Sequence, residues 1–206
     1  LYRDRIAVIA NGVDTDWFVP NKRPSAQPFV IVQVGRFVPE KGHKTALRAL
    51  ATLKRSQPLA RLVLVGAGPL RDECEALATT LGIRSEVDFV GRHLAVRPWL
   101  WSADAFWMPS ETEGLPVACV GAMSCGLPIV ASDVGGLPEI VDSTCGYIIS
   151  RGDAEALSKV TSLLIEDSEH AQALGCAARR KVERDYSLNK VAEAYEAVYR
   201  QSVETE

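Results

Sequence analysis

The sequence predicts an α/β fold, in which a Rossmann-like parallel sheet has helices on both faces. Short apolar runs alternate with helical segments at least four times along the 206 residues, as in the repeated β–α units of doubly wound folds. The runs are apolar throughout, which is typical of parallel strands buried on both faces. We therefore expect a single domain over residues 1–206, with a ligand beside the loops that follow its strands.

Seven apolar runs are expected to form strands. A turn residue such as glycine, proline, serine or asparagine follows each of them within two residues. The runs are residues 6–9, 29–34, 61–65, 87–90, 105–108, 128–131 and 145–149. The ligand-binding loops expected after them are residues 35–42, 66–69, 91–93, 110–115 and 132–138. Residues 20–28, rich in proline, serine and glutamine, are expected to form a loop as well.

Helices are expected between these strands and at the end of the chain. In the first, leucines at positions 47, 50 and 53 share one side. Gly82 is a natural C-cap for the second. Pro116 suits the first turn of another helix, which stops at Gly126. The expected helices are residues 43–56, 69–81, 96–102, 116–125, 153–165, 168–184 and 188–201.

The composition argues against several classes of protein. A formal net charge of −3 gives no overall attraction to nucleic acid or to an acidic membrane. No stretch is long and apolar enough to span a bilayer. The five cysteines are odd in number and include no CxxC pair, so we expect reduced, buried thiols in a cytoplasmic protein. The first residues, Leu-Tyr-Arg-Asp, include no methionine and no signal-like start, so we expect a piece of a longer protein.

Two cations lie in the loop after the second apolar run. Arg36 offers a planar fork of donors to a phosphate, and Lys41 offers a point charge. A helix start expected at His43 adds backbone N–H groups, so the loop could seat a diphosphate. The alternative is an ordinary solvated basic loop, in which these side chains pair with Glu40 or with nothing.

The glycines of Gly66-Ala67-Gly68 do not complete a known nucleotide motif. A dinucleotide-binding fingerprint would need a third glycine at position 71, where the chain has Arg71. No Gly-Lys-Ser/Thr closes a glycine run, so a phosphate P-loop also fails. We expect these two glycines to form a tight turn between strand and helix, and neither a nicotinamide enzyme nor a P-loop ATPase fits well.

Two further side chains lie in the predicted site loops. Arg92 could stack on a base or remain an ordinary exposed arginine, and the residues alone do not decide between them. Glu113 could accept hydrogen bonds from sugar hydroxyls, whereas Glu111 beside it raises the alternative of a glycosidase carboxylate pair. The three histidines lie in unrelated places, so a histidine-based metal site is not expected.

A series of short motifs carries a resemblance to a known family. In order they are Asn11-Gly12-Val13-Asp14 with Phe18, Val34-Gly35-Arg36 with Lys41-Gly42, Val65-Gly66-Ala67-Gly68-Pro69, Val87-Asp88-Phe89-Val90-Gly91, Pro109-Ser110 with Glu113-Gly114-Leu115-Pro116, Ala122-Met123, Cys125-Gly126-Leu127-Pro128 and Gly135-Gly136 with Glu139. As a set, the motifs resemble the C-terminal donor-binding domain of the retaining glycosyltransferases of family 4, which have the GT-B fold. Residues 187–206 resemble the C-terminal helix that crosses back to the family's first domain.

The resemblance implies roles for particular residues. Arg36 and Lys41 match the basic pair that binds the donor diphosphate and stabilises the leaving nucleoside diphosphate without a metal or another cofactor. Glu113 matches the glutamate that contacts the donor sugar. The substrate-binding positions that the resemblance implies are Gly35, Gly91 and Arg92, the last two bordering the base, and the backbone around Gly114, Leu115 and Val117. The implied partners are a nucleotide sugar and the N-terminal acceptor domain, which this chain lacks, but no nucleic acid.

The chain departs from the family at one important position. Eight residues after Glu113, where the family usually has a second glutamate that grips the ribose, this chain has Gly121. This departure supports one alternative to a donor domain, a degenerate scaffold. A second alternative is another GT-B enzyme, such as a nucleotide-sugar epimerase or a phosphorylase, which would share the fold but fits the motifs less well. Without the acceptor domain we expect no turnover by this piece alone. Contact with the inner face of a membrane is expected only through that domain or the acceptor.

Overall fold

A computed structural model describes residues 6–21 and 28–204 of the chain. Its centre is a sheet of six strands, all of which pair in parallel, in the order β3-β2-β1-β4-β5-β6. The strands are β1 (Val30–Val34), β2 (Arg61–Val65), β3 (Val87–Gly91), β4 (Ala105–Met108), β5 (Ile129–Ser132) and β6 (Gly146–Ile149). The chain builds the sheet outward from β1 to β3 and then returns to place β4 on the other side of β1. The carboxyl ends of β1 and β4 therefore form the topological switch point, where such sheets bind their ligands.

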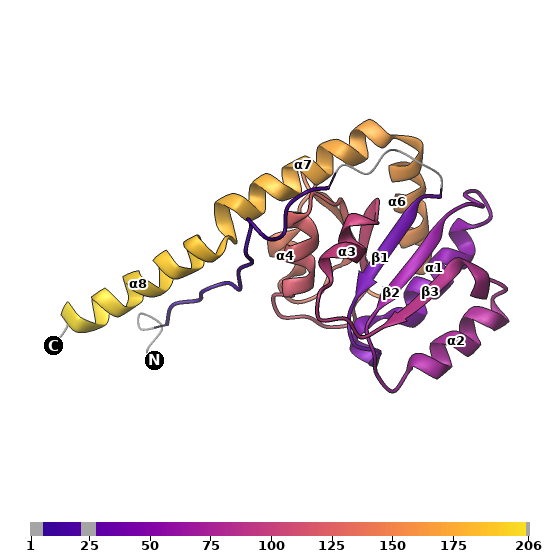
Figure 1. The fold of residues 1–206 in the computed structure, drawn as a ribbon, viewed down its shortest axis with the longest axis horizontal. Helices are drawn as coiled ribbons and strands as arrows, with labels where there is room; N and C mark the ends of the chain where they lie inside the picture. Colours follow the sequence, from indigo (N-terminus) through magenta and orange to yellow (C-terminus); the bar gives the residue numbers. More distant parts are fainter. Residues whose placement is uncertain (1–5, 22–27, 205–206) are drawn as a thin grey trace.

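Helices cover both faces of this sheet, as predicted (Figure 1). The helices are α1 (His43–Leu53), α2 (Arg71–Thr80), α3 (Arg97–Trp101), α4 (Val117–Ser124), α5 (Leu137–Ile140), α6 (Ala154–Glu166), α7 (Ser168–Asp185) and α8 (Leu188–Glu204). One apolar core joins the sheet to α1, α2 and α6, and a second joins it to α3, α4, α5 and the C-terminal half of α7. Every residue of β4 and β5 is buried, which explains why all of them except Ser132 are apolar.

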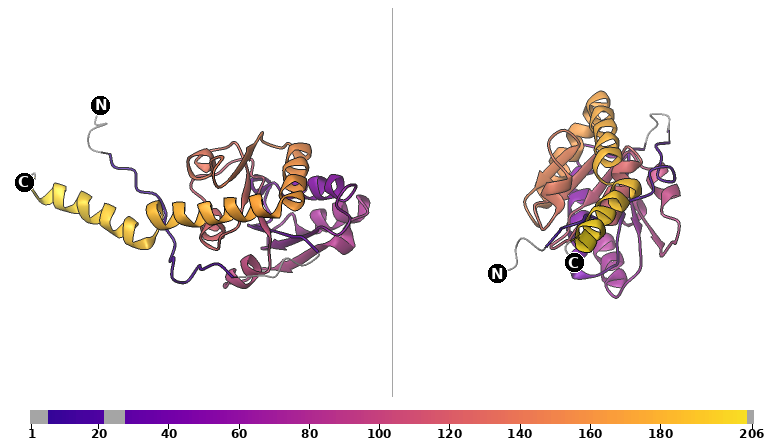
Figure 2. Two further views of the ribbon diagram at one scale, coloured as in Figure 1. Left: turned by 90° about the horizontal axis from the view of Figure 1, so that it is seen from above. Right: turned by 90° about the vertical axis from the view of Figure 1, so that its left-hand side faces the viewer.

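The last helix and the first described residues extend together beyond the sheet (Figures 1 and 2). They meet at Val13, whose N–H donates to the Tyr186 carbonyl at 2.9 Å and whose carbonyl accepts from the Leu188 N–H at 3.0 Å. Along α8, the side chains of Leu188, Tyr195 and Tyr199 are about half exposed or more. None of the described helices has both the length and the apolar content needed to cross a membrane.

Most predicted elements are confirmed within a few residues, but four predictions were wrong. Residues 6–9 form no strand, because no strand lies beside them in the described part of the chain. The expected loop 132–138 ends inside α5, a short helix that has a proline in its first turn. Pro116 is the N-cap of α4 and not part of its first turn. Four cysteines are buried thiols, whereas Cys176 is exposed. Most of the expected loop 20–28 lies outside the described residues.

Candidate functional site

The switch point brings together two residues that the sequence places 72 positions apart. Lys41 follows β1 and Glu113 follows β4, and the Lys41 Nζ lies 2.6 Å from the Glu113 Oε1. The same carboxylate oxygen accepts a hydrogen bond from the Ser110 hydroxyl at 2.7 Å. The Glu113 side chain is only 7% exposed and that of Lys41 is 24% exposed. The ammonium uses one donor in this pair, so it can still bind an anion with the others.

The backbone of the β1–α1 loop fixes the place from which Lys41 extends. Pro39–Lys41 form a 3₁₀ turn that ends at Gly42, which has a φ of 65°. A Cβ atom on Gly42 would overlap the Pro109 carbonyl, so only glycine lets this loop approach the β4–α4 loop so closely. Gly35 lies below the Lys41 side chain, since a Cβ there would be 3.4 Å from the lysine Cγ and Cδ. The small residue therefore leaves room for the lysine stem.

His43, the first residue of α1, is buried beside this loop. Its ring stacks on Phe37, with ring centroids 4.1 Å apart. Burial, followed by the positive charge of Lys41, lowers the pKa of His43 to about 4. The imidazole is therefore neutral near pH 7 and adds no second charge beside Lys41. Neither of its ring nitrogens has a hydrogen-bond partner within the part of the chain that the structure describes.

Two other loops hold the loop that carries Glu113. The Gly136 N–H donates to the Gly114 carbonyl at 3.1 Å, and the Asn11 side-chain amide donates to the Leu115 carbonyl at 3.1 Å. Gly135 has a φ of 53°, and a Cβ atom on it would overlap the Glu113 carbonyl. The Gly135-Gly136 turn therefore rests against the backbone of Glu113 and Gly114, and any larger residue at position 135 would push the two apart.

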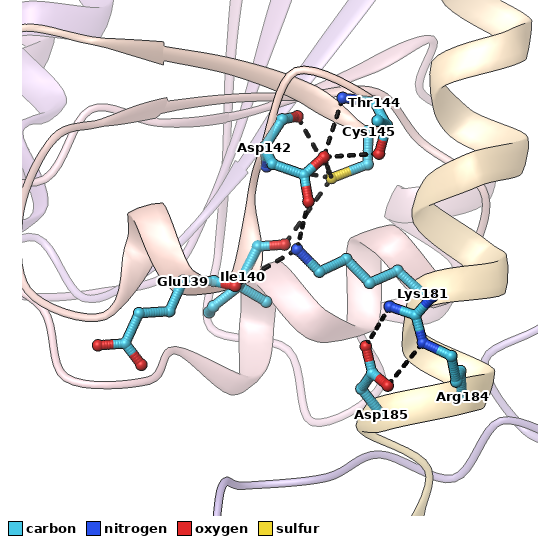
Figure 3. Close-up of polar contacts among 8 residues, drawn as sticks. All are labelled: Glu139, Ile140, Asp142, Thr144, Cys145, Lys181, Arg184 and Asp185. Atoms are coloured by element: carbon cyan, nitrogen blue, oxygen red, sulfur yellow. Dashed lines mark hydrogen bonds and ion pairs between the residues drawn. The ribbon is translucent and has the colours of Figure 1, made fainter.

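Helix α5 begins directly after the Gly135-Gly136 turn, and polar contacts near its end join it to α7 (Figure 3). The Lys181 Nζ lies 2.6 Å from the Asp142 Oδ2 and donates to the Glu139 carbonyl at 3.3 Å. The hydrogen bonds from Lys181 and from Thr144 hold the pKa of Asp142 well below its usual range. This carboxylate therefore stays ionised, and its pair with Lys181 ties the end of α5 to α7.

The amino end of α4 supplies a partial positive charge next to Glu113. Its N-cap is Pro116, and no side chain caps the helix. Among the described residues, the N–H groups of Val117 and Ala118 have no hydrogen-bond partner. Val117 is 49% exposed although most of α4 is buried, so the start of the helix is open to a ligand. Free N–H groups and the helix dipole both favour an anion there.

Gly121, one turn into α4, is buried against the side chain of Phe18. A Cβ atom on Gly121 would lie 3.5 to 3.8 Å from three carbons of the Phe18 ring, which is ordinary contact. The backbone of Phe18 is fixed, because its carbonyl accepts hydrogen bonds from Ser124 and Arg179. A glutamate at position 121 would therefore have to extend past this ring or displace it.

The other predicted cations are more exposed than Lys41. Arg36 is exposed, and within residues 6–21 and 28–204 its side chain has no ion pair or hydrogen bond. Arg92 is also exposed, in the loop after β3. Gly91, which precedes it, has a φ of 80° and accepts a hydrogen bond from the Gly66 N–H at 2.8 Å. No contact among the described residues joins Arg92 to Lys41 or to Glu113.

The structure also resolves two alternatives. A Cβ atom on Gly66 would overlap the Gly35 carbonyl, which confirms that the glycine run is a tight turn. Arg71 donates to the Phe89 carbonyl at 2.9 Å and so ties α2 to β3. Glu111 pairs with Arg151 at 3.6 Å, whereas Glu113 pairs with Lys41, so the contacts of the two carboxylates give no support to a glycosidase pair. In the described part of the chain, no three His, Cys, Asp or Glu side chains form a group that could hold a metal ion.

Sequence reasoning missed three residues that support the site. Ser110 and Asn11 appeared only as parts of motifs, and their contacts with Glu113 and Leu115 depend on the tertiary structure. Gln33 was counted as part of an apolar strand, yet its amide Nε2 donates to the Lys41 carbonyl at 2.6 Å. Its signal was visible, because a buried polar side chain in an otherwise apolar strand usually has a specific hydrogen-bond partner.

Comparisons with known proteins agree with this geometry. The family model described as "Glycosyl transferases group 1" matches residues 15–181. A GDP-mannose-dependent alpha-(1-6)-phosphatidylinositol monomannoside mannosyltransferase of Mycolicibacterium smegmatis is 33% identical in an alignment over 189 residues that covers 82% of this chain and 49% of that protein. The chain thus spans about half the length of the curated relatives it matches.

Solved structures share the fold. A sucrose-phosphate synthase from Thermosynechococcus elongatus is 28% identical, with a TM-score of 0.86, over 96% of this chain and 53% of that one. Anabaena Alr3699/HepE, solved in complex with UDP, is 24% identical, with a TM-score of 0.85, over 96% of this chain and 57% of that one. The family model matches most of the chain, and these structures share its sheet. This chain therefore belongs to the group 1 glycosyltransferases, whose fold is GT-B.

Proposed function

We propose that this chain is the donor-binding part of a retaining glycosyltransferase. In this proposal it binds a nucleoside-diphosphate sugar, and the full-length protein transfers the sugar to a hydroxyl acceptor with retention at the anomeric carbon. The observation that carries the proposal is the Lys41–Glu113 pair at the switch point, next to the uncapped start of α4. A cation, a carboxylate and free N–H groups in one place suit a ligand that has both phosphates and hydroxyls.

Different residues of the site would bind different parts of the ligand. Lys41 and Arg36 would bind the diphosphate, together with the N–H groups at the start of α4. They would stabilise the negative charge that develops on the leaving nucleoside diphosphate, which is electrostatic catalysis without a metal ion. Glu113 would accept hydrogen bonds from the sugar, since its second carboxylate oxygen is not used by Lys41 or Ser110. The loop of Gly91 and Arg92 would border the base.

The relatives are associated with more than one nucleotide. The mycobacterial relative is named for its dependence on GDP-mannose, whereas Alr3699/HepE was solved with UDP. We therefore propose a nucleotide sugar as the class of ligand. We also propose that α8 packs against the acceptor-binding part of the full-length protein, since its exposed Leu188, Tyr195 and Tyr199 offer an apolar surface. The four buried thiols of the chain suit a cytoplasmic location.

Calorimetric titration of the full-length protein with UDP, GDP and ADP tests the donor site. We expect saturable binding with a preference for one nucleotide, and a loss of about 10- to 100-fold in affinity in Arg36→Ala, because a charge-assisted phosphate contact is removed. The melting temperature should not change, because the Arg36 side chain has no intramolecular partner among the described residues. Arg55→Ala is the matched control, since Arg55 is also exposed but follows the opposite end of α1. Equal affinity in wild type and Arg36→Ala would contradict the assignment.

Gly121 supports a second candidate, a scaffold domain that has lost its donor. Its position has no carboxylate, and the Phe18 ring occupies the space beside it. The same titration separates the two functions. If the full-length protein binds none of the nucleotides or their sugars, the scaffold is favoured. If it binds one of them and Lys41 is required, the donor site works despite the glycine.

A further inference from the structure

We propose that Gln33 is a positioning residue that sets the place of Lys41 in the donor site. The proposal rests on the proposed function, because the role of Lys41 is the binding of a phosphate. Gln33 lies in β1, and only 3% of it is exposed. Its neighbours on the same face of the sheet, Ile31 in β1 and Leu64 in β2, are apolar and buried. A buried amide beside apolar side chains destabilises the folded state unless it forms a hydrogen bond within the protein.

The hydrogen bond of Gln33 leads directly to the site. Its Nε2 donates to the Lys41 carbonyl at 2.6 Å. The orientation of the amide is determined by this contact, because the reversed amide would place two acceptor oxygens against each other. The other end of the amide, Oε1, has no hydrogen-bond partner within the described residues. The amide group therefore contributes to the structure through its N–H donor and not through its oxygen.

The bond to the Lys41 carbonyl completes the fixation of that residue. Glu113 holds its ammonium, and Gly35 lies against its stem. The peptide after Lys41 leads into Gly42, whose left-handed φ of 65° turns the chain into α1. Gln33 adds a contact that comes from within the sheet. It therefore ties the backbone of the loop to the core and fixes where the lysine side chain starts.

This role differs from a contribution to stability. Replacing Gln33 with methionine would remove the donor but also the unpaired Oε1, and it would keep the volume. The two changes act in opposite directions on the folded state, since an unsatisfied buried acceptor is itself destabilising. The melting temperature of Gln33→Met should therefore stay close to that of the wild type. The loop would lose its anchor, so the ammonium should be less well placed for a phosphate.

The test is calorimetric titration of the full-length protein with the nucleoside diphosphate that it binds. For Gln33→Met we expect an affinity about 5- to 30-fold below wild type, with little change in melting temperature. Gln57→Met is the matched control. It makes the same chemical change in an amide that bonds to Ser162 and Glu166, between α1 and α6. It should bind the nucleotide as the wild type does.

A second variant distinguishes the positioning of Lys41 from a purely structural role of Gln33. In Gln33→Glu the carboxyl group can donate to the Lys41 carbonyl only while it is protonated. Its affinity relative to wild type should rise as the pH falls from 8 to 5.5, whereas the ratio for Gln33→Met should stay constant. Wild-type affinity in Gln33→Met, or an affinity of Gln33→Glu equal to that of Gln33→Met at every pH, would overturn the role of Gln33. Absence of binding by the wild type would instead overturn the proposed function and this inference with it.

Discussion

The two sides of the candidate site are built differently. On one side, Lys41 and Glu113 are largely buried and paired, and Ser110, Gln33 and the Gly135-Gly136 turn hold them from three directions. On the other side, the loop after β3 carries Arg92, His93 and Leu94, all exposed. In that loop His93 Nε2 forms a hydrogen bond with the Val90 carbonyl at 3.0 Å, and its ring meets the edge of Trp99.

The difference indicates where the site is pre-organised. Catalysis by fixed charges requires groups that need not move as charge develops, and the buried Lys41–Glu113 side meets that requirement. Recognition of a base can be achieved with an exposed arginine and a ring, which adapt to different partners. The comparison predicts that substitutions on the buried side affect every nucleotide alike and strongly. Substitutions on the exposed side should act weakly and depend on the base.

The largest effect is expected for Lys41→Met. It removes the phosphate cation and leaves Glu113, which is only 7% exposed, without its ion pair. We expect at least about a 100-fold loss of nucleotide affinity and a decrease of about 1.5–3 kcal/mol in the free energy of unfolding, the usual worth of a charged hydrogen bond. Calorimetry and urea unfolding measure the two quantities.

The control for Lys41→Met is Lys44→Met. Lys44 forms an ion pair with Glu73 of the same 2.6 Å length, but the two side chains are 42% and 58% exposed. Surface pairs of this kind contribute about 0–1 kcal/mol. If the two variants lost similar amounts of stability and affinity, the buried pair would have no special role.

A smaller effect on nucleotide affinity is expected for Gly135→Ala. The new Cβ atom would overlap the Glu113 carbonyl, and φ at this position is 53°. We expect a loss of about 2–3 kcal/mol in the free energy of unfolding or a displaced Glu113 loop, from strain and overlap together. In the second case the affinity for the nucleotide sugar should fall more than that for the nucleotide.

Gly82→Ala separates strain from overlap. Gly82 has a φ of 71°, but nothing lies within 4 Å of the place where its Cβ would be. The free energy of unfolding of Gly82→Ala should decrease by only about 1–2 kcal/mol, which is the cost of a left-handed backbone for alanine, and the affinity should stay at the wild-type value. Equal behaviour of the two alanine variants would mean that the contact of Gly135 with the Glu113 loop is not needed.

The smallest effect is expected for Arg92→Ala. The side chain is exposed and has no contact with the buried pair among the described residues. We expect a change of about threefold or less in affinity, since exposed charges contribute little. The change should differ between UDP, GDP and ADP. A large and base-independent loss, measured by the same titrations, would place Arg92 on the phosphate and not at the base.

The sheet could be predicted from the sequence because its strands are short, apolar and followed by turn residues. The segment 6–9 has the same composition, but no strand lies beside it in the described part of the chain, and composition cannot show that. The short helix α5 was missed because Gly135, Gly136 and Pro138 are typical of a loop. Helix α5 is tied to the body by the Lys181–Asp142 pair, whose partners are 39 residues apart.

The site could be predicted in part. That Lys41 and Glu113 each follow a strand was visible in the sequence, and so was the expectation that both face the same edge of the sheet. Their direct contact depends on β4 returning to the side of β1, which is a property of the topology. The cover of Gly121 by Phe18, and the bond from Gln33 to Lys41, likewise join residues by tertiary packing that no spacing reveals.

The central claim is that the two residues of the buried pair bind different parts of the donor: Lys41 binds the phosphates and Glu113 binds the sugar. Glu113→Gln in the full-length protein tests it most directly, with titrations of the nucleoside diphosphate and of its sugar conjugate. Glu111→Gln is the control, because Glu111 pairs with Arg151 instead. We predict that Glu113→Gln weakens binding of the nucleotide sugar about tenfold more than that of the nucleotide, the worth of one charged hydrogen bond. Equal losses for both ligands, or equal behaviour of the two variants, would contradict the account.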